Sequence, residues 1–579
     1  MAEPNPKNIC CGVVVPPATG AADTYNWDTA YGITFEKVNH SIVQAKSSPA
    51  NFKGKYVDGL SGDKYVIAAN FGAWQLSGGS GDLVHMTLPL TNGTLTPEAG
   101  GNPIPFSGSA SIEVKLEWLP QPGATAAKGN NHLKINLTTN DPVNSPIVSI
   151  VQIAVNPARL INAVQSVLEA WLLANLQQFN HVFSVVDLAA EADKAGFQWL
   201  KPTKIGYAVN TEGATDPKNY VFGVLAMTEG RAGDKLDYQI SPNIIPTGAD
   251  AGFLISQERF LSKLLLPGMA VLFKGATAAD FTLDSDGTMV QNKNPLTFQT
   301  FQLQDGSKID GATVDAEKFS VEARATSLFM MFEDFHFPWT PKGSIVPHGF
   351  VVHLTYTAES VLFLDQNNHF QMCTVGSRDK DDPKKSTGPS LNVIVTKTTA
   401  EKWTEIAVGL VEGIVLAVVG AMIGGALGPE VDEAAEEAEN AANDAIENTG
   451  EADPLEFDSG FEGDDEDDNL TENNSDEDSE ASSDLEEPSR ISKFKGFFKR
   501  NWRKMLGATI GSIAGVGLGA LPQILEAYAE NNLAEMPTLD EFADESINTT
   551  TWPGAAGTKL LNAALNGSLQ LGIQITFDQ

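Results

Sequence analysis

Strands whose residues alternate between apolar and polar are the feature that most constrains this fold. From Ile112 to Trp118 every second residue is apolar, and the residues between them are Glu or Lys. The segments 132–138 (HLKINLT) and 568–577 (SLQLGIQITF) show the same period of two. Such strands have one buried and one solvated face, which is typical of antiparallel sheets. The sequence therefore predicts a fold rich in antiparallel sheet.

Three segments instead show the period of a helix. Apolar residues fall on one helical face within 31–42, within 160–172, and within a segment that begins at Ser256 as N-cap and ends at Pro267. Helix followed by strands occurs twice, which predicts an α+β fold of two related halves with a boundary near residue 250. We expect a flexible N-terminus over 1–22, a first half over 23–250 and a second half over 251–579. The second half would contain the glycine-rich segments 406–428 and 505–521 and, between them, the insertion 429–504.

Half of the net charge of this chain is concentrated in one segment. The 579 residues carry a net charge of −36, and residues 430–487 contain 26 acidic residues and no Lys or Arg. With the seven basic residues that follow, the segment 429–504 has a net charge of −19, which leaves −17 for the rest. Few apolar residues occur in the acidic tract, so we expect it to be disordered. It is interpreted as a solvating linker, with a pH-responsive interaction segment as the alternative. This charge also disfavours nucleic acid as a partner.

Two glycine-rich segments, 406–428 and 505–521, have glycines at every fourth residue. On helices such rows allow two backbones to approach closely. The favoured interpretation is a pair of helices packed inside a soluble domain, and the alternative is a hairpin that inserts into membranes on demand.

A basic run precedes the second glycine-rich segment and interleaves cations with aromatic side chains. This pattern suits contact with an anionic lipid surface. An electrostatic partner for the acidic tract is an equally supported interpretation. The candidate membrane-contact residues are Lys493, Lys495, Phe497, Phe498, Lys499, Arg500, Trp502 and Arg503.

The sequence contains no motif typical of catalysis or of metal binding. It lacks a Walker loop, an HExxH helix, a GxSxG elbow and a CxxC pair, and its three cysteines match no zinc spacing. We therefore expect no catalytic residue, no metal, no cofactor and no enzymatic activity. The first thirty residues lack the pattern of a secretory signal, so a cytoplasmic location is expected, with release by a non-classical route as an alternative.

Two stretches resemble a known family. The segments 24–42, with its Asn26–Thr29 and Lys37–Asn39 motifs, and 251–269 are similar to the forty-seven-kilodalton proteins encoded beside some clostridial botulinum neurotoxin genes. That family is part of the tubular lipid-binding (TULIP) superfamily. The resemblance implies two TULIP-like halves, each a long helix wrapped by a curved antiparallel sheet, with an apolar groove for lipid tails. It carries over no catalytic residue, and the acidic insertion departs from the pattern.

Three functions follow as hypotheses. The first is a non-enzymatic protein that binds lipid or another hydrophobic ligand and is associated with toxins. In that case the apolar helical faces would contact the ligand through Val164, Leu168, Trp171, Leu172, Phe260, Leu261 and Leu264. The second is a toxin-complex component with a membrane-inserting hairpin, and the third is a scaffold that works without lipid. The expected partners are accordingly a lipid, an anionic membrane surface, or a protein from the same gene cluster.

Overall fold

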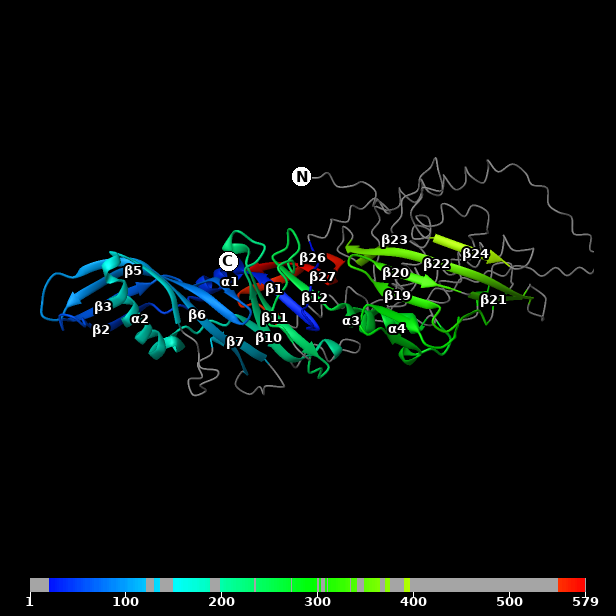
Figure 1. Ribbon diagram of the computed structural model, residues 1–579, viewed down its shortest axis with the longest axis horizontal. Coiled ribbons are helices and arrows are strands. Elements are labelled where there is room, and N and C mark those ends of the chain that lie inside the picture. The colour runs from blue at the N-terminus through cyan, green and yellow to red at the C-terminus, as the bar shows by residue number, and fades with distance from the viewer. Residues whose placement is uncertain are drawn as a thin grey trace, which may run out of the picture.

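The computed structural model of this protein describes residues 20–120, 130–135, 149–187, 198–233, 236–271, 273–298, 301–302, 308–309, 311–333, 335–340, 348–364, 370–374, 390–395 and 550–577. Three antiparallel sheets follow one another along the long axis of the molecule (Figure 1). The described helices are α1 (Phe35–Ala45), α2 (Ile161–Asn175), α3 (Gln257–Arg259), the π-helix η5 (Phe260–Leu265) and α4 (Leu266–Val271), with short 3-10 turns η1 (Ala158–Leu160), η2 (Leu176–Gln178), η3 (Gln198–Leu200), η4 (Pro217–Asn219) and η6 (Ala278–Asp280).

Helix α2 lies against the first sheet. Its strands are β2 (Asn51–Val57), β3 (Lys64–Phe71), β4 (Gln75–Ser80), β5 (Leu83–Pro97), β6 (Ile104–Pro120), β7 (Asn130–Ile135), β8 (Ser149–Asn156), β9 (Ser184–Asp187) and β25 (Thr550–Thr551). Helix α2 contacts both β2 and β8, two strands at opposite margins of the sheet. The alternating strands predicted around Ile112 and Leu133 are β6 and β7, and their alternating apolar side chains are buried except for the half-buried Trp118.

The second sheet lies at the centre and joins distant parts of the chain. Its order is β10 (Pro202–Asn210), β11 (Val221–Thr228), β1 (Thr29–Thr34), β12 (Ala251–Ile255), β27 (Ser568–Phe577) and β26 (Ala555–Asn566). It therefore contains strands from both sides of the predicted boundary near residue 250. That division into halves stays a prediction.

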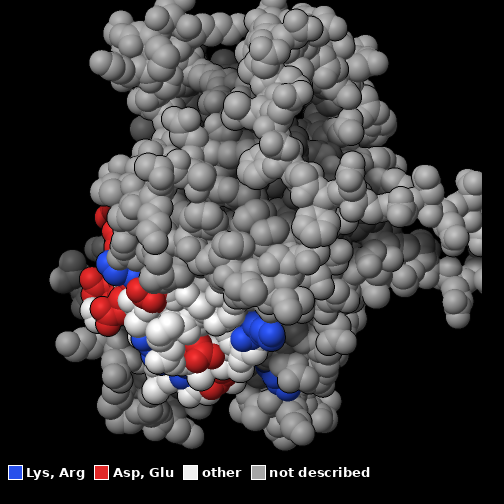
Figure 2. Space-filling view, turned by 90° about the vertical axis from the view of Figure 1, so that its right-hand side faces the viewer, with Lys and Arg blue, Asp and Glu red and all other residues white. Residues whose placement is uncertain are grey.

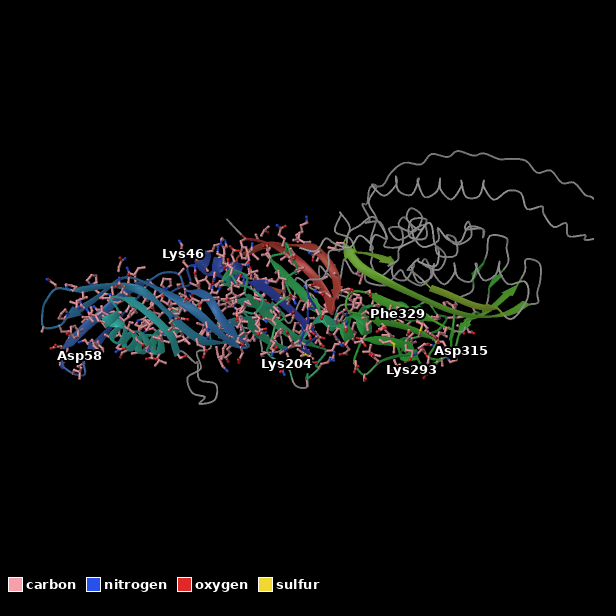
Figure 3. The ribbon with its side chains drawn as sticks, turned by 45° about the horizontal axis from the view of Figure 1, so that its top comes forward. Lys46, Asp58, Lys204, Lys293, Asp315 and Phe329 are labelled. Carbon is pink, nitrogen blue, oxygen red and sulfur yellow. The ribbon has the colours of Figure 1, made fainter. Side chains whose placement is uncertain are left out.

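The third sheet is formed by strands from the middle of the chain, most of them short, around the 17-residue strand β22. They are β13 (Phe281–Leu283), β14 (Met289–Asn292), β15 (Leu296–Thr297), β16 (Phe301–Gln302), β17 (Lys308–Ile309), β18 (Thr313–Val314), β19 (Phe319–Ala323), β20 (Leu328–Phe332), β21 (Phe335–Thr340), β22 (His348–Leu364), β23 (Phe370–Thr374) and β24 (Ser390–Val395). Figure 3 places Phe329 of β20 in this part of the molecule, where the guanidinium of Arg324 lies 3.7 Å from the centre of its ring.

A row of glycines crosses the central sheet. Gly32 pairs with Gly223 on one side and with Gly252 on the other, and Gly252 pairs with Gly572. The segment 236–250, which we call the strap, runs over this row and links β11 to β12. A Cβ atom at Gly252 would lie 1.9 Å from the carbonyl oxygen of Ile244 in the strap. Cβ atoms at Gly32 and Gly223 would instead meet side chains of the strap, Ile244 and Ile240. The glycines are therefore required because the strap occupies the space of their side chains.

The described structure confirms the α+β class, as mostly antiparallel sheet with few helices. The predicted helix over 31–42 is wrong at its start: Tyr31 lies in β1, and helix α1 begins at Phe35. Tyr31 is held between β11 and β12, so pairing on both sides overrides the helical spacing. The helix after Ser256 also continues past Pro267, because α4 follows η5 without a break and the burial of Leu265, Leu266 and Met269 outweighs the hydrogen bond that a proline cannot make.

Candidate binding surfaces

The apolar face of α2 lies on the first sheet. The chain enters the helix through η1, and the i, i+4 spacing places Val164, Leu168 and Leu172 on one face. All three side chains are completely buried. These predicted lipid contacts of α2 are thus part of a protein core.

Helix α2 contacts the sheet directly. A Cβ atom at Gly54 of β2 would lie only 2.6 Å from Cγ1 of Val167 on α2. One turn further on, the ring centre of the half-buried Trp171 lies 5.3 Å from that of Phe71 and 6.4 Å from that of Phe52. At these positions the space between helix and strand is filled by side chains, which excludes an acyl chain there.

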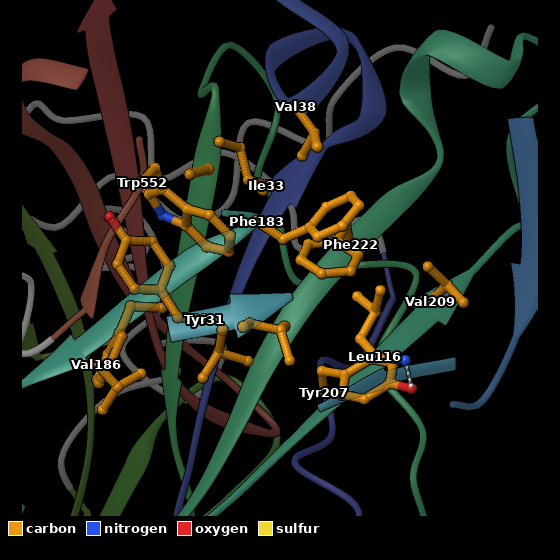
Figure 4. Close-up of a cluster of buried hydrophobic side chains, with 14 of the residues drawn as sticks. Tyr31, Ile33, Val38, Leu116, Phe183, Val186, Tyr207, Val209, Phe222 and Trp552 are labelled. Atoms are coloured by element: carbon orange, nitrogen blue, oxygen red, sulfur yellow. Dashed lines mark hydrogen bonds between the residues drawn. The ribbon is translucent and has the colours of Figure 1, made fainter. Parts of the chain in front are cut away.

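Aromatic side chains continue this filling from the first sheet into the central one. Figure 4 shows Tyr31, Phe183, Phe222 and Trp552 gathered in the buried cluster between the two sheets. Neighbouring ring centres are 4.9 to 6.2 Å apart along the row Phe71, Trp74, Phe179, Phe183, Phe222, Trp552 and Tyr31. Such edge and stacked contacts stabilise a fixed packing rather than a fluid cavity.

The second predicted set of contacts lies on the helix after β12. The side chain of Ser256 accepts a hydrogen bond from the backbone N–H of Arg259, which confirms the predicted N-cap. Phe260 and Leu261 are completely buried and Leu264 is 8% exposed. This helix contacts β14 of the third sheet. The two sets of predicted residues therefore lie on different sheets and form no common site.

The motif at Asn26–Thr29 forms a tight turn into β1. Tyr25 and Asn26 have φ values of 50° and 67°, in the left-handed region that asparagine tolerates better than most residues. Trp27 is completely buried, and its Nε1–H donates to the carbonyl of Asp237 in the strap at 2.8 Å. The motif thus ties the start of β1 to the strap.

Asp28 is the centre of a buried polar network. Its carboxylate accepts hydrogen bonds from the backbone N–H and hydroxyl of Thr228 and from the guanidinium of Arg231, at 2.7 to 2.9 Å. Arg231 also donates to Glu258 of α3. The network therefore connects β1 and the end of β11 to the helix of the next sheet.

A second ion-pair group lies beside the first. Glu229 accepts from the buried Arg259 and from Lys263. Burial alone would raise the pKa of Glu229, but the hydrogen bonds from Lys263 and Arg259 outweigh it and hold this pKa below its ordinary value. Arg259 also lies 5.4 Å from the ring centre of Trp199. This arrangement fixes α3 and η5 against the central sheet.

Comparison with known proteins assigns the family. The sequence model of the family described as "OrfX-like: Protein OrfX2/OrfX3/P47" matches residues 24–444. The chain belongs to the OrfX-like family. The predicted resemblance to the forty-seven-kilodalton proteins is thereby confirmed.

The relatives of this OrfX-like chain match it over part of their length. Protein OrfX3 of Paraclostridium bifermentans is 32% identical over 45% of this chain and 56% of its own. Protein OrfX3 of Clostridium botulinum (strain Kyoto / Type A2) is 28% identical over 51% of this chain and 63% of its own. The crystal structure of P47 of Clostridium botulinum E1 covers 96% of this chain with a TM-score of 0.53 at 14% identity, a likeness of fold.

Several predicted features lie outside the described residues. They are the glycine-rich segments 406–428 and 505–521, the acidic tract, and the basic run with Lys493, Lys495, Phe497, Phe498, Lys499, Arg500, Trp502 and Arg503. Within the part of the chain that the structure describes, no cluster of three potential metal ligands occurs. No helix in that part is long and apolar enough to cross a bilayer.

His181 is a buried base that the sequence did not single out. Its Nδ1 lies 3.0 Å from the hydroxyl of Ser47, just after α1, and its ring meets Phe183 edge to face. Burial lowers the pKa of His181 to about 4. The side chain is therefore neutral at physiological pH and belongs to the core.

Sequence reasoning also missed Arg231, which pairs with Asp28, and Glu258, which pairs with Arg231. Arg231 lies outside every periodic pattern, so its sequence position alone gave no sign of a role. The one sign in the sequence that this network exists was the position of Glu258, two residues after the predicted N-cap Ser256 in the segment 251–269 that resembles the family.

Proposed function

We propose that this OrfX-like chain is a non-enzymatic accessory protein that works by binding other proteins, as a scaffold or assembly module. The observation that carries the proposal is the direct contact between α2 and β2 at Val167 and Gly54. A carrier of lipid tails needs open space between helix and sheet, whereas an assembly module needs a rigid body with accessible surfaces. The aromatic row from Phe71 to Tyr31 fills the interior and so supports the rigid body that an assembly module needs.

The family resemblance suggests the source of the partner. Proteins similar to this chain are encoded beside some clostridial neurotoxin genes, so a protein from the same gene cluster is the proposed partner. Co-expression of the full chain with each such protein, followed by affinity purification and size-exclusion chromatography, tests this. A stable complex with one of them is expected, and the absence of any complex would contradict the proposal.

Lipid binding is the second candidate, and the TULIP resemblance favours it. The groove of this candidate lies near the helix after β12, where Leu264 retains 8% exposure, rather than under α2. Native mass spectrometry and lipid extraction of the purified full chain test this, and Leu264→Trp should displace the lipid. Val43→Trp, on the 49% exposed side chain of α1, is the control. Protein that carries no lipid in any preparation would eliminate this candidate.

A third proposal concerns the segments outside the described residues. The glycine-rich hairpin would insert into membranes when the acidic tract is protonated, with the basic run contacting anionic lipid. Leakage from anionic liposomes at pH about 4.5, near the carboxylate range, is the expected signal. Deletion of 429–504 should abolish the pH dependence of this leakage.

Figure 2 shows acidic and basic side chains interspersed on the described part of one end of the molecule. This surface offers no single-sign electrostatic field to attract lipid.

A further inference from the structure

The last strands of the chain belong to the folded body but lie far from the rest of it in sequence. Strand β24 ends at Val395, and the next described strand, β25, begins at Thr550. We call the segment 550–577, which contains β25, β26 and β27, the C-terminal hairpin, and we call residues 396–549 the connection. The hairpin lies beyond residues 24–444, the part of the chain that the family model matches.

The C-terminal hairpin enters the central sheet along one strand. Strand β27 forms five consecutive pairs with β12, from Ala251 opposite Ile573 to Ile255 opposite Leu569. Among the described strands β26 pairs with β27 alone, and Figure 1 shows both strands, in red, beside β12. Such addition of strands gives affinity through main-chain hydrogen bonds and specificity through alternate side chains.

Both faces of β27 are covered by the body. On one face Leu569, Leu571 and Ile573 are completely buried in the main core. On the other face the side-chain amide of Gln570 donates hydrogen bonds to two carbonyl groups of the strap, at 2.6 and 3.0 Å. The hairpin is thus bound by backbone pairing, by apolar contacts and by polar contacts at the same time.

The C-terminal hairpin also contacts the other two sheets. Strand β25 pairs with β9 of the first sheet, and Trp552 meets Tyr31 edge to face in the aromatic row. At the turn between β26 and β27, the backbone N–H of Gly567 donates to the carbonyl of Ala325, in the turn between β19 and β20 of the third sheet, at 2.7 Å. All of these contacts are made by described residues that lie outside the connection.

We propose that β12, β9 and the strap form a docking surface for the C-terminal hairpin, which stays bound when the connection is cut. The occupant is the hairpin of the same chain, because the connection keeps it at a high effective concentration, whereas a second copy with a net charge of −36 is repelled. An isolated two-stranded hairpin is marginally stable, so this one acquires its structure on the docking surface. A cut therefore frees one end of the glycine-rich and acidic segments without dismantling the body. The inference goes beyond the proposed assembly function and does not depend on it.

A cleavable version of the full chain tests the inference. The recognition sequence of a site-specific protease is inserted between Asp544 and Glu545, so that cutting the folded protein yields a long fragment, 1–544, and a short one, 545–579. The short fragment should co-elute with the long fragment in size-exclusion chromatography in native buffer and separate from it in concentrated urea. A short fragment that elutes alone in native buffer overturns the inference.

Matched substitutions on β27 show whether the docking surface causes the retention. After cutting, a labelled short fragment is challenged with excess unlabelled peptide 545–579, and fluorescence anisotropy measures its release. Ile573→Ala, at a completely buried side chain, should speed release by about tenfold or more. The neighbouring Gln574→Ala, at an exposed side chain, is the control and should leave the rate unchanged.

The remaining outcomes also decide the question. Equal release rates of the two variants would show that the buried face of β27 does not hold the hairpin, which contradicts the inference. A cut protein that elutes as a dimer with exchanged hairpins would assign the docking surface to a second copy instead. If Ile573→Ala does not fold, co-elution of the unmodified cut fragments decides alone. No other protein is present, so failure of the proposed gene-cluster partner leaves this test unaffected.

Discussion

Asp28 illustrates how single buried residues determine this structure. Its side chain is 3% exposed and accepts hydrogen bonds from Thr228 and Arg231, so a charge is buried only because donors surround it. The motif at Asn26–Thr29 was visible in the sequence as a family resemblance. Its role was not, because Thr228 and Arg231 lie about two hundred residues away in the chain.

Asp28→Asn should destabilise the fold. The amide preserves the shape of the carboxylate but leaves the Arg231 guanidinium without its buried counter-charge. We expect a loss of about 3 kcal/mol in the free energy of unfolding, the cost of breaking a buried ion pair. Urea denaturation measures this. Asp286→Asn, at an exposed turn, is the control and should change little, and equal stability of the two variants would refute a structural role of the network.

His181 predicts a dependence of stability on pH. The neutral ring is buried and its pKa is lowered to about 4, whereas the unfolded value is near 6.5. The unfolded chain therefore binds more protons between these values, so stability falls as pH decreases from 6.5 toward 4, by about 3 kcal/mol in total. His181→Gln should flatten the stability profile in this window. An unchanged slope in the variant would show that other groups cause the pH dependence.

At the scale of elements, periodicity predicted the strands and the two later helices because the apolar face of each is buried. It did not predict that Ser568 and Gln570 of β27 are buried as well, where Gln570 donates to carbonyl groups of the strap. It failed at Tyr31, where both neighbours in the sheet are strands from distant parts of the chain. Hydrophobic periodicity also did not predict the strap. Its position depends on the glycines at 32, 223, 252 and 572, which become a row only when four separate strands pair.

Gly252→Ala tests the fit between strap and sheet. The new methyl group would lie 1.9 Å from the carbonyl oxygen of Ile244, so the strap must move. We expect a loss of stability of about 2 kcal/mol, typical of overpacking. Gly59→Ala is the matched control, since nothing lies within 4 Å of that position. Figure 3 shows the adjacent Asp58 at the outer end of the first sheet, far from the strap. Equal thermal stability of the two variants would contradict the account.

At the scale of the whole molecule, the sequence predicted the class of fold and the family but not the state of the interior. Helical periodicity placed Val164 and Leu168 on a buried face, yet it gave no sign of whether lipid or protein would cover them. That distinction depends on Gly54, which lies more than one hundred residues away and has no side chain. Because side chains fill the interior, we propose that the chain binds other proteins through its surface rather than carrying a ligand inside.

The central claim, that α2 lies directly on the sheet, is tested most directly by a double-mutant cycle between Gly54 and Val167. Gly54→Ala should lower the free energy of unfolding by about 1–3 kcal/mol, because the methyl group meets Val167. Val167→Ala should restore most of that loss, giving a coupling energy above about 1 kcal/mol. If a ligand-sized space separated the two elements, Gly54→Ala would instead stabilise the protein by about 0.5 kcal/mol with no coupling to Val167.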